Sequence, residues 1–528
     1  MQPTMQSTGR FLRSPSLRCL AAVPLIAATI IAARAQTTVP PAHEPKAEAA
    51  ASQPQAPNPE REKLPPAVTT HHMLIRPGHP LTFTATAGSI PVRDAKGAVL
   101  SDVAFVAYQL EDANRQTRPV TFVFNGGPGM ASGWLQVGAV GPWRVVLRDD
   151  PGQPAAPPAP VPNADTWLDF TDLVFIDPPG TGFSTIRDDD EARKRLWSVT
   201  GDAVALASVI RRWLDRNNRS VAPHFLLGES YGGFRVPRIA RALQSDQGVA
   251  VAGMVLLSPL LDAHDESGFT DPFGWVDRLP SEVAAARALK GPVTRAGLAD
   301  VEQYAATDYL TDLLRGERDG AALDRMAARV AALTGFDPAL VRRYDGRLDV
   351  DVFLHELQRA RGLVGSRYDA TIGDPDPFPH RLLDGYPDPV LEGFKAPVTS
   401  AMVAIYHDML QWHPKTTYRL ENDNAVRQWD WGHGMGRPES ISFLQAAMSL
   451  NPRMRVLIGH GMFDLVTPYF TDVLVLRTLP DNEAARVTLT VYPGGHMFYS
   501  RDASRAALHE DARALYANVS HPAGASDP

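Results

Sequence analysis

The chain is poor in cysteine, because only Cys19 carries a thiol among its 528 residues. One thiol cannot form an intramolecular disulfide, so stability must come from the hydrophobic core. Thiolate zinc sites need several cysteines and are excluded as well. Cys19 also lies within a predicted export signal, so the mature chain would have no cysteine nucleophile.

Long hydrophobic runs are also scarce. The longest near the N-terminus, residues 20–33, is shorter than the roughly 17 to 25 residues of a membrane span. It follows Arg10, Arg13 and Arg18 and ends in a small-x-small pattern at residues 33–35. These are the three parts of a secretory signal, so residues 1–35 are predicted to be cleaved, with an uncleaved anchor helix as the alternative. We therefore expect export to the periplasm or the extracellular space, without stable membrane insertion after cleavage.

An excess of positive charge is absent. The chain has 52 Lys and Arg against 59 Asp and Glu, a formal net charge of −7. Loss of residues 1–35 would remove four arginines and leave a net charge of −11. Such a balance argues against nucleic acid or anionic lipid as the main partner.

Metal-ligand spacing is missing too. The adjacent His71 and His72 have no further ligand at a recognisable spacing, so neither a metal nor an organic cofactor is predicted. Before them, residues 36–69 are rich in Ala, Pro and Gln without periodicity, which is typical of a flexible segment. After them, short segments with strand composition predict an antiparallel hairpin or meander: residues 71–75, 81–86, 89–94 and 103–110.

What the sequence does contain is a strand, a sharp turn and a helix around Ser230. An apolar run at residues 225–227 leads into Gly228-Glu-Ser230-Tyr-Gly232, and residues 234–243 have helical spacing. In this context Gly-x-Ser-x-Gly is the nucleophile elbow, whose glycines make room for a strained turn. The pattern predicts Ser230 as a nucleophile, whereas a plain surface turn is the alternative.

A second glycine-rich loop follows the buried strand predicted at residues 120–124. Its sequence, Asn-Gly-Gly-Pro-Gly at residues 125–129, allows backbone N–H groups to approach a reacting atom. We therefore predict an oxyanion hole formed by the N–H groups of Gly127 and Tyr231. A phosphate loop is disfavoured because no Gly-Lys-Ser/Thr follows, and a plain turn stays open.

Strands and helices alternate on both sides of a long helical insertion. Strands are predicted at residues 173–176, 251–257, 454–458 and 487–491, with helices at 199–214 and 505–519. This order predicts an α/β fold: a mostly parallel central sheet flanked by helices. Residues 70–261 and 438–528 would form this core. Residues 262–437 would form a cap, with helices at 281–289, 295–314, 320–333 and 350–361, and with Trp412, Trp429 and Trp431 either lining the site or packing inside the cap.

Two late loops complete a catalytic triad in the chain order Ser, Asp, His. Asp464 follows the strand at 454–458, and His496 follows the last strand. Ser230, Asp464 and His496 are therefore the predicted triad. His496 is preferred over His460 and His433 because its Gly-Gly-His loop lies beyond the last strand, and the neighbouring acids Asp472 and Asp481 are expected to be solvated at the surface.

Four motifs together resemble the serine carboxypeptidases, a branch of the α/β-hydrolases, and suggest a bacterial-type member. They are residues 125–129, 177–184, 228–233 and 495–497. The resemblance implies cleavage of C-terminal peptide bonds through an acyl-enzyme. It also implies that Asn125 and Glu229 bind the C-terminal carboxylate of the substrate, with Glu229 protonated at low pH.

Three positions depart from that family. Val123 and Ala139 stand where the family has a tryptophan and a second glutamate of the carboxylate clamp, and Met130 replaces a cysteine. Acyl-enzyme chemistry survives these changes, but the specificity for a free C-terminus is weakened. An esterase, amidase or acyltransferase with the same triad is therefore an alternative, and a catalytically inactive binding protein is a third. The predicted partner is a peptide or another acyl substrate, and the sequence does not predict an oligomeric state.

Overall fold

The computed structural model describes residues 63–76, 80–147, 159–262, 271–380, 386–432 and 438–520. The predicted signal, most of the segment 36–69, and His433 lie outside the described residues. Within the described ranges, no helix has both the length and the hydropathy that crossing a bilayer requires.

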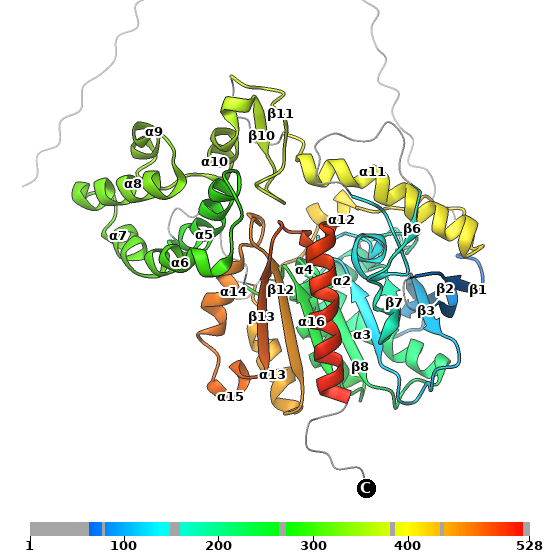
Figure 1. The fold of residues 1–528 in the computed structure, drawn as a ribbon. Coiled ribbons are helices and arrows are strands. Elements are labelled where there is room, and N and C mark those ends of the chain that lie inside the picture. The colour runs from blue at the N-terminus through cyan, green and yellow to red at the C-terminus, as the bar shows by residue number, and fades with distance from the viewer. Residues whose placement is uncertain are drawn as a thin grey trace, which may run out of the picture. The chain divides into compact units, whose positions relative to one another are not determined.

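The described part of the chain is built on one nine-stranded sheet with the order β1-β2-β3-β7-β4-β8-β9-β12-β13 (Figure 1). The first three strands form an antiparallel meander, and β3 pairs antiparallel with β7. All pairs from β7 to β13 are parallel, so the predicted α/β-hydrolase architecture is confirmed. The strands are β1 (Val68–Leu74), β2 (Leu81–Arg93), β3 (Val99–Leu110), β4 (Val120–Phe124), β7 (Asp172–Ile176), β8 (His224–Glu229), β9 (Gly253–Leu257), β12 (Arg455–Gly461) and β13 (Val487–Tyr492).

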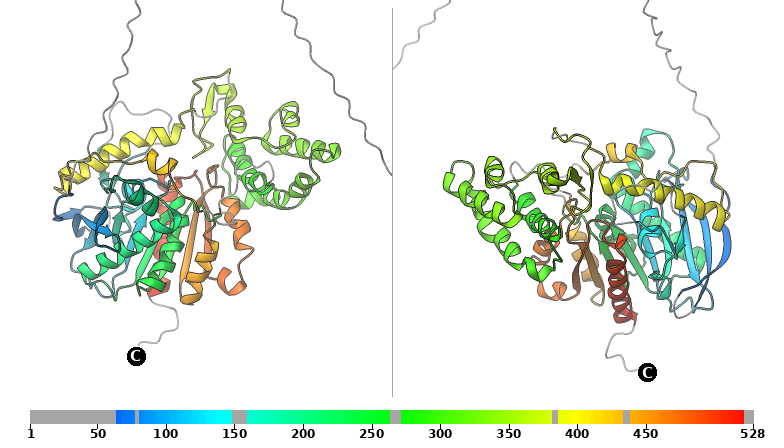
Figure 2. Two further views of the ribbon diagram at one scale, coloured as in Figure 1. Left: turned by 180° about the vertical axis from the view of Figure 1, so that it is seen from behind. Right: turned by 45° about the horizontal axis from the view of Figure 1, so that its top comes forward.

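Helices cover both faces of the parallel strands, which explains why the central strands β4, β8 and β9 are buried along their whole length. Along β8, Phe225 and Leu227 pack with α16 (Asp502–Ser520) on one face of the sheet. Leu226, between them, packs with α3 (Val199–Asn217) on the other face. Figures 1 and 2 show α16 lying along the sheet. The remaining core helices and short segments are α1 (Gly133–Leu135), η1 (Gln136–Val140), β5 (Trp143–Arg144), β6 (Val161–Pro162), η2 (Trp167–Asp169), α2 (Asp190–Leu196), α4 (Tyr231–Asp246), α13 (Ile441–Leu450), α14 (Tyr469–Leu476), α15 (Asp481–Ala484) and η7 (Phe498–Ser500).

One strand of the meander differs from the prediction. The segments 81–86 and 89–94 form a single strand, β2, and Gly88 does not end it. A Cβ atom at Gly88 would lie 2.7 Å from the Cβ of Ala67, so the glycine permits a close approach of the neighbouring chain. Glycine within a strand often marks such an approach and not a turn.

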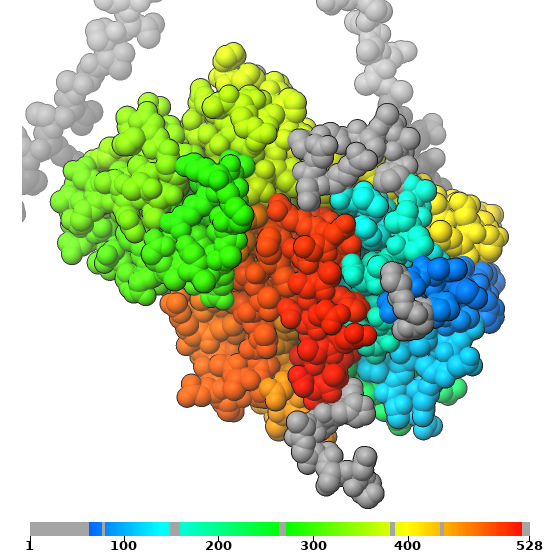
Figure 3. Space-filling model, in the orientation of Figure 1, coloured from blue at the N-terminus to red at the C-terminus, as the bar shows by residue number. Residues whose placement is uncertain are grey.

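The insertion has a hydrophobic cluster of its own, which also includes Phe463 and Tyr469 of the core. Its first helix, α5 (Phe273–Ala288), begins eight residues before the prediction and contains Pro280. Val276 and Leu279 are buried with the later turns, and this packing stabilises a helix that proline disfavours. Figure 3 shows the insertion in green and yellow beside the C-terminal part of the chain. Its elements are α5, η3 (Arg295–Leu298), α6 (Ala299–Tyr304), η4 (Ala305–Tyr309), α7 (Leu310–Arg315), α8 (Gly320–Thr334), α9 (Pro338–Arg343), α10 (Val350–Leu357), η5 (Arg359–Arg361), β10 (Leu363–Gly365), β11 (Gly373–Pro375), α11 (Pro389–Ala404), η6 (Ile405–Met409) and α12 (Asp423–Arg427).

Candidate active site

Ser230 sits at a strained turn between β8 and α4. Its φ of 58° is a positive value that few residues other than glycine adopt. The Ser230 N–H donates to the carbonyl of Leu257 at 2.9 Å, which ties the turn to β9. A Cβ atom at Gly228 would lie 2.1 Å from the carbonyl oxygen of Gly232, so the turn requires glycine there. The Ser230 hydroxyl does not cap α4 and is half-buried, as a nucleophile needs to be.

His496 and Asp464 meet beyond the ends of β13 and β12. Nδ1 of His496 lies 2.8 Å from Oδ2 of Asp464, and both side chains are buried. The other oxygen of Asp464 accepts the N–H groups of Val466 at 2.8 Å and Thr467 at 3.0 Å. With Nδ1 engaged by the carboxylate, Nε2 is the nitrogen of His496 that can exchange a proton.

The charge of Asp464 controls the pKa of His496. Burial alone would lower this pKa, but the charge of Asp464, its hydrogen bond and the charge of Glu229 outweigh burial and raise it. The imidazole therefore holds a proton more readily than a free histidine does, as a general base must.

Ser258 and Thr467 connect the loops of His496 and Asp464. The Ser258 hydroxyl donates to the carbonyl of His496 at 2.8 Å, and the Ser258 carbonyl accepts from the Thr467 hydroxyl at 2.9 Å. No hydrogen bond joins Ser230 to His496 among the described residues. In free enzymes such catalytic contacts are often long and shorten when substrate binds.

The predicted oxyanion loop packs directly against the elbow. A Cβ atom at Gly126 would lie 2.6 Å from the backbone nitrogen of Tyr231 and 2.8 Å from the Cβ of Ser230. The Tyr231 N–H is the first of α4, so it has no acceptor within its own helix. Gly127 has a φ of 101°, a conformation that favours glycine.

A buried ion pair, which no sequence motif predicted, supports this loop. Arg235 donates through Nη1 to the carbonyl of Asn125 and through Nε to Asp202 at 2.5 Å. Both side chains are almost fully buried. Burial raises the pKa of Asp202, against the opposing charge and hydrogen bond of Arg235. An arginine on an apolar helix face was the available signal, since arginine is rarely buried without a partner.

Glu229, the residue before Ser230, lies in a hydrogen-bonded group with Asn125 and Tyr499. Asn125 donates through Nδ2 to Oε2 of Glu229 and accepts the Leu135 N–H at 2.9 Å. Tyr499 donates to Oε1 at 2.5 Å. Glu229 is 4% exposed, and burial raises its pKa to about 7, with Asp464 acting in the same direction and His496, Tyr499 and Asn125 against it.

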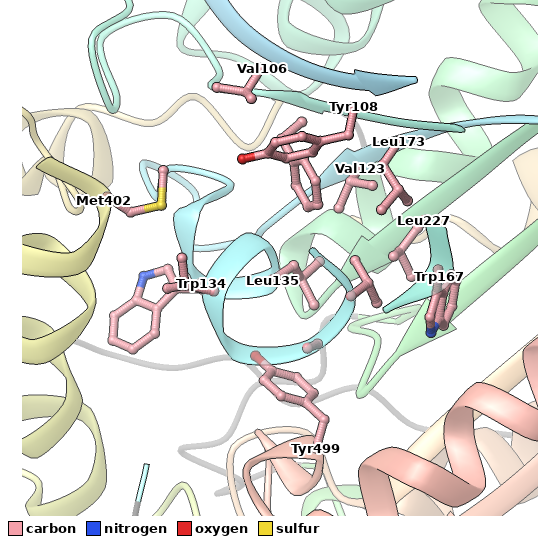
Figure 4. Close-up of a cluster of buried hydrophobic side chains, with 14 of the residues drawn as sticks. Val106, Tyr108, Val123, Trp134, Leu135, Trp167, Leu173, Leu227, Met402 and Tyr499 are labelled. Atoms are coloured by element: carbon pink, nitrogen blue, oxygen red, sulfur yellow. The ribbon is translucent and has the colours of Figure 1, made fainter. Parts of the chain in front are cut away.

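Tyr499 also lies beside the segment that carries the departure at Ala139. A Cβ atom at Gly138 would lie 3.0 Å from the Tyr499 ring, and Ala139 and Val123 are buried in the same hydrophobic cluster as Tyr499. Figure 4 shows Val123 and Tyr499 in this cluster. The two altered positions therefore bring no polar group to Glu229, whereas Tyr499 brings one. No sequence motif singles out Tyr499, although it stands three residues after His496.

The other histidine and acidic residues considered for the triad lie in different settings. His460 is buried, with Nε2 3.0 Å from Oδ2 of Asp472 and Nδ1 3.9 Å from Oδ2 of Asp464. The expectation that Asp472 is solvated is wrong, because it is 1% exposed and faces His460 from α14. Asp481 is exposed, as expected.

The described residues contain no group of three or more His, Cys, Asp or Glu side chains that could hold a metal. His71 pairs with Glu111, and His72 packs on Phe83 and Trp143. The three tryptophans of the insertion differ in setting. Trp412 is buried, Trp429 packs on Tyr231, and Trp431 is 37% exposed with its ring 5.4 Å from that of Tyr231.

The nine-stranded sheet, the elbow and the late loops together define an α/β-hydrolase. Residues 77–296 match the family model of the serine carboxypeptidases (Peptidase_S10), so the resemblance predicted from the motifs is confirmed over that segment.

Fungal enzymes are among the relatives. The chain is 31% identical over 186 residues to the pheromone-processing carboxypeptidase KEX1 of Coprinopsis cinerea, which covers 34% of this chain and 28% of the relative. The chain is 32% identical over 150 residues to KEX1 of Yarrowia lipolytica, and the alignment covers 28% of this chain and 22% of that relative. The chain thus spans less than a third of the length of these relatives. Their fungal origin gives no support to the expected bacterial-type member.

A solved structure extends the likeness in fold. The prohormone-processing carboxypeptidase KEX1 of Saccharomyces cerevisiae aligns with a TM-score of 0.50 at 16% identity, covering 82% of this chain and 91% of that chain. At this identity the alignment establishes the shared fold alone.

Proposed function

We propose that the protein is an exported serine carboxypeptidase that hydrolyses C-terminal peptide bonds through an acyl-enzyme. The observation that carries the proposal is the buried group of Glu229 and Asn125 directly beside Ser230. A carboxyl group with a pKa of about 7 next to a nucleophile is an acid that can be neutral under mildly acidic conditions. Such an acid can donate a hydrogen bond to a carboxylate, as the C-terminus of a peptide requires.

The reaction would follow the acyl-enzyme route. Ser230 attacks the scissile carbonyl while His496 takes the hydroxyl proton and Asp464 stabilises the imidazolium. The N–H groups of Gly127 and Tyr231 bind the oxyanion of the tetrahedral intermediate. His496 then gives its proton to the leaving amine, the C–N bond breaks, and the released product carries the C-terminal carboxylate. Water, deprotonated by His496, hydrolyses the ester on Ser230 and restores the free hydroxyl.

Comparison of a peptide with a free C-terminus and its C-terminal amide tests this proposal. We expect strong preference for the free acid under mildly acidic conditions, because a charged carboxylate is a stronger acceptor for protonated Glu229 than the carbonyl oxygen of an amide. Equal cleavage of both would reject the carboxypeptidase. It would favour an esterase, amidase or acyltransferase with the same triad, an option that Val123 and Ala139 keep open.

Covalent labelling tests the alternative that the protein is a catalytically inactive binding protein. A fluorophosphonate forms an adduct with Ser230 only if the triad activates the hydroxyl. We expect an adduct on the folded wild-type chain and none on Ser230→Ala. Export is tested by measuring the mass of the secreted protein. If the signal is cleaved as proposed, this mass should correspond to a chain that begins at residue 36.

A further inference from the structure

A turn of the cap is fixed rigidly between β10 and β11. The Ser366 hydroxyl oxygen accepts the N–H groups of Tyr368 at 3.0 Å and Asp369 at 3.2 Å. The carboxylate of Asp388 in turn accepts the Ser366 hydroxyl at 2.7 Å and the Arg367 N–H at 2.8 Å. Side-chain hydrogen bonds of this kind hold a loop in one conformation.

The same turn is bonded to the loop of Asp464. The Leu465 N–H donates to the carbonyl of Arg367 at 3.0 Å, and the Ala370 N–H donates to the carbonyl of Phe463 at 3.1 Å. Both residues that flank Asp464 are therefore held by the cap, on either side of the acid.

The loop of His496 is held as well. The His496 N–H donates to the carbonyl of Tyr368 at 2.5 Å. Arg501, farther along that loop, donates to Asp369 at 2.7 Å and to Thr371 at 2.9 Å. The position of Tyr368 relative to the imidazole is thus set by bonds on both sides of it.

The Tyr368 side chain faces the catalytic groups. Its ring stands edge-on to the imidazole of His496, with centroids 5.4 Å apart at 89°. Its hydroxyl makes no hydrogen bond within the described part of the chain, although the ring is half-buried. Burial raises the pKa of Tyr368, and the charges of Asp388, Glu421, Asp464 and Glu229 raise it further, so the hydroxyl remains a protonated donor.

The proposed reaction indicates what lies between these groups. The leaving residue must present its amine to His496, which protonates it, and its carboxylate to Glu229. A side chain that packs on the imidazole of His496 borders the space for that residue. We propose that Tyr368 is a substrate-contacting specificity residue, whose hydroxyl donates to the C-terminal carboxylate of the peptide. It would supply a donor that Val123 and Ala139 cannot, and this inference rests on the carboxypeptidase function proposed above.

The test uses Tyr368→Phe, which keeps the ring against His496 and removes only the donor. Loss of one hydrogen bond to a charged group should raise KM for a free-acid peptide roughly tenfold to a hundredfold. The rate on p-nitrophenyl acetate, which has no carboxylate, should stay within about twofold of wild type. Inhibition by free phenylalanine should weaken in parallel, whereas phenylalaninamide should inhibit Tyr368→Phe and wild type equally.

Tyr304→Phe is the matched control, because that residue also carries a cap hydroxyl without a hydrogen-bond partner but lies in α6. Its KM should equal that of wild type. Unchanged KM in Tyr368→Phe, or equal losses on peptide and ester, would overturn the inference. Failure of the proposed function is a separate outcome, since it is read from wild type alone as equal cleavage of acid and amide.

Discussion

Tyr499 donates a 2.5 Å hydrogen bond to Oε1 of Glu229, the residue that precedes the nucleophile. The bond links the loop of His496 to the end of β8 inside a buried cluster. Because a phenol hydroxyl stabilises the ionised carboxylate, it lowers the pKa of Glu229 against the larger effect of burial.

Removal of this donor should move the pH dependence of carboxylate binding. In Tyr499→Phe the pKa of Glu229 should rise, so Glu229 stays protonated to higher pH. The alkaline fall of kcat/KM on free-acid peptides should then shift upward, as measured by a pH series with wild type beside it. An unchanged or downward shift would contradict the role of Tyr499.

Glu229→Gln should abolish the fall of kcat/KM on free-acid peptides at alkaline pH, because an amide donates a hydrogen bond without titrating. In wild type, carboxylate binding should be complete below the pKa of about 7 and lost as pH rises through it. The variant should cleave free-acid peptides with no fall in that range, and Glu229→Ala, which has no donor, should be weak at every pH. A persisting fall in Glu229→Gln would assign it to another group.

The same substitution should affect stability in a defined direction. The folded-state pKa of Glu229 lies above its ordinary value of 4.5, so its contribution is fully present below 4.5 and is lost as pH rises through about 7. The loss is at most about 3 kcal/mol for a shift of this size. Glu229→Gln should therefore gain stability relative to wild type as pH rises, measured by chemical denaturation at acidic and alkaline pH.

Asp464→Asn should preserve the fold and remove most of the activity. The side-chain oxygen can still accept the N–H groups of Val466 and Thr467, but the amide nitrogen cannot accept a hydrogen bond from Nδ1–H of His496. The imidazole would take the wrong tautomer, and kcat should fall by about 10⁴. Fluorophosphonate labelling should slow in proportion, while the thermal midpoint stays close to wild type. Near-normal turnover would remove Asp464 from the triad.

Variants of the ion pair between Arg235 and Asp202 should affect stability and catalysis differently. Arg235→Met would leave Asp202 buried without its partner and should cost about 3 to 5 kcal/mol of unfolding free energy. The Asn125 carbonyl would also lose its donor, so the oxyanion loop would be held less firmly. The double variant Arg235→Met, Asp202→Leu should recover much of the stability but not kcat. Full recovery of both would mean that the pair has no part in positioning that loop.

Local patterns were sufficient for much of this fold. The strands β4 and β8 are buried on both faces, so apolar residues dominate both sequences, which end where glycine-rich loops begin. The chain order alone led to Asp464 and His496, which the structure places 2.8 Å apart. Their catalytic roles, like those of Gly127 and Asn125, stay predictions.

The features that the sequence did not predict depend on contacts between distant parts of the chain. Asp472 was expected at the surface because nothing near it in sequence indicates that α14 turns it toward His460. Tyr368 lies in the insertion, more than a hundred residues from the histidine loop that it contacts. Gly88 resembled a turn because the approach of Ala67 is visible only in three dimensions.

Gly495 gives the contact between cap and histidine loop a wider consequence. A Cβ atom there would lie 1.8 Å from the carbonyl oxygen of Tyr368, and one at Gly461 would lie 1.8 Å from the carbonyl oxygen of Gly495. Three backbones are thus stacked with no room for a methyl group. A cap transplanted from another hydrolase to alter selectivity would have to reproduce this stacking, or the recipient enzyme would lose the alignment of its own histidine.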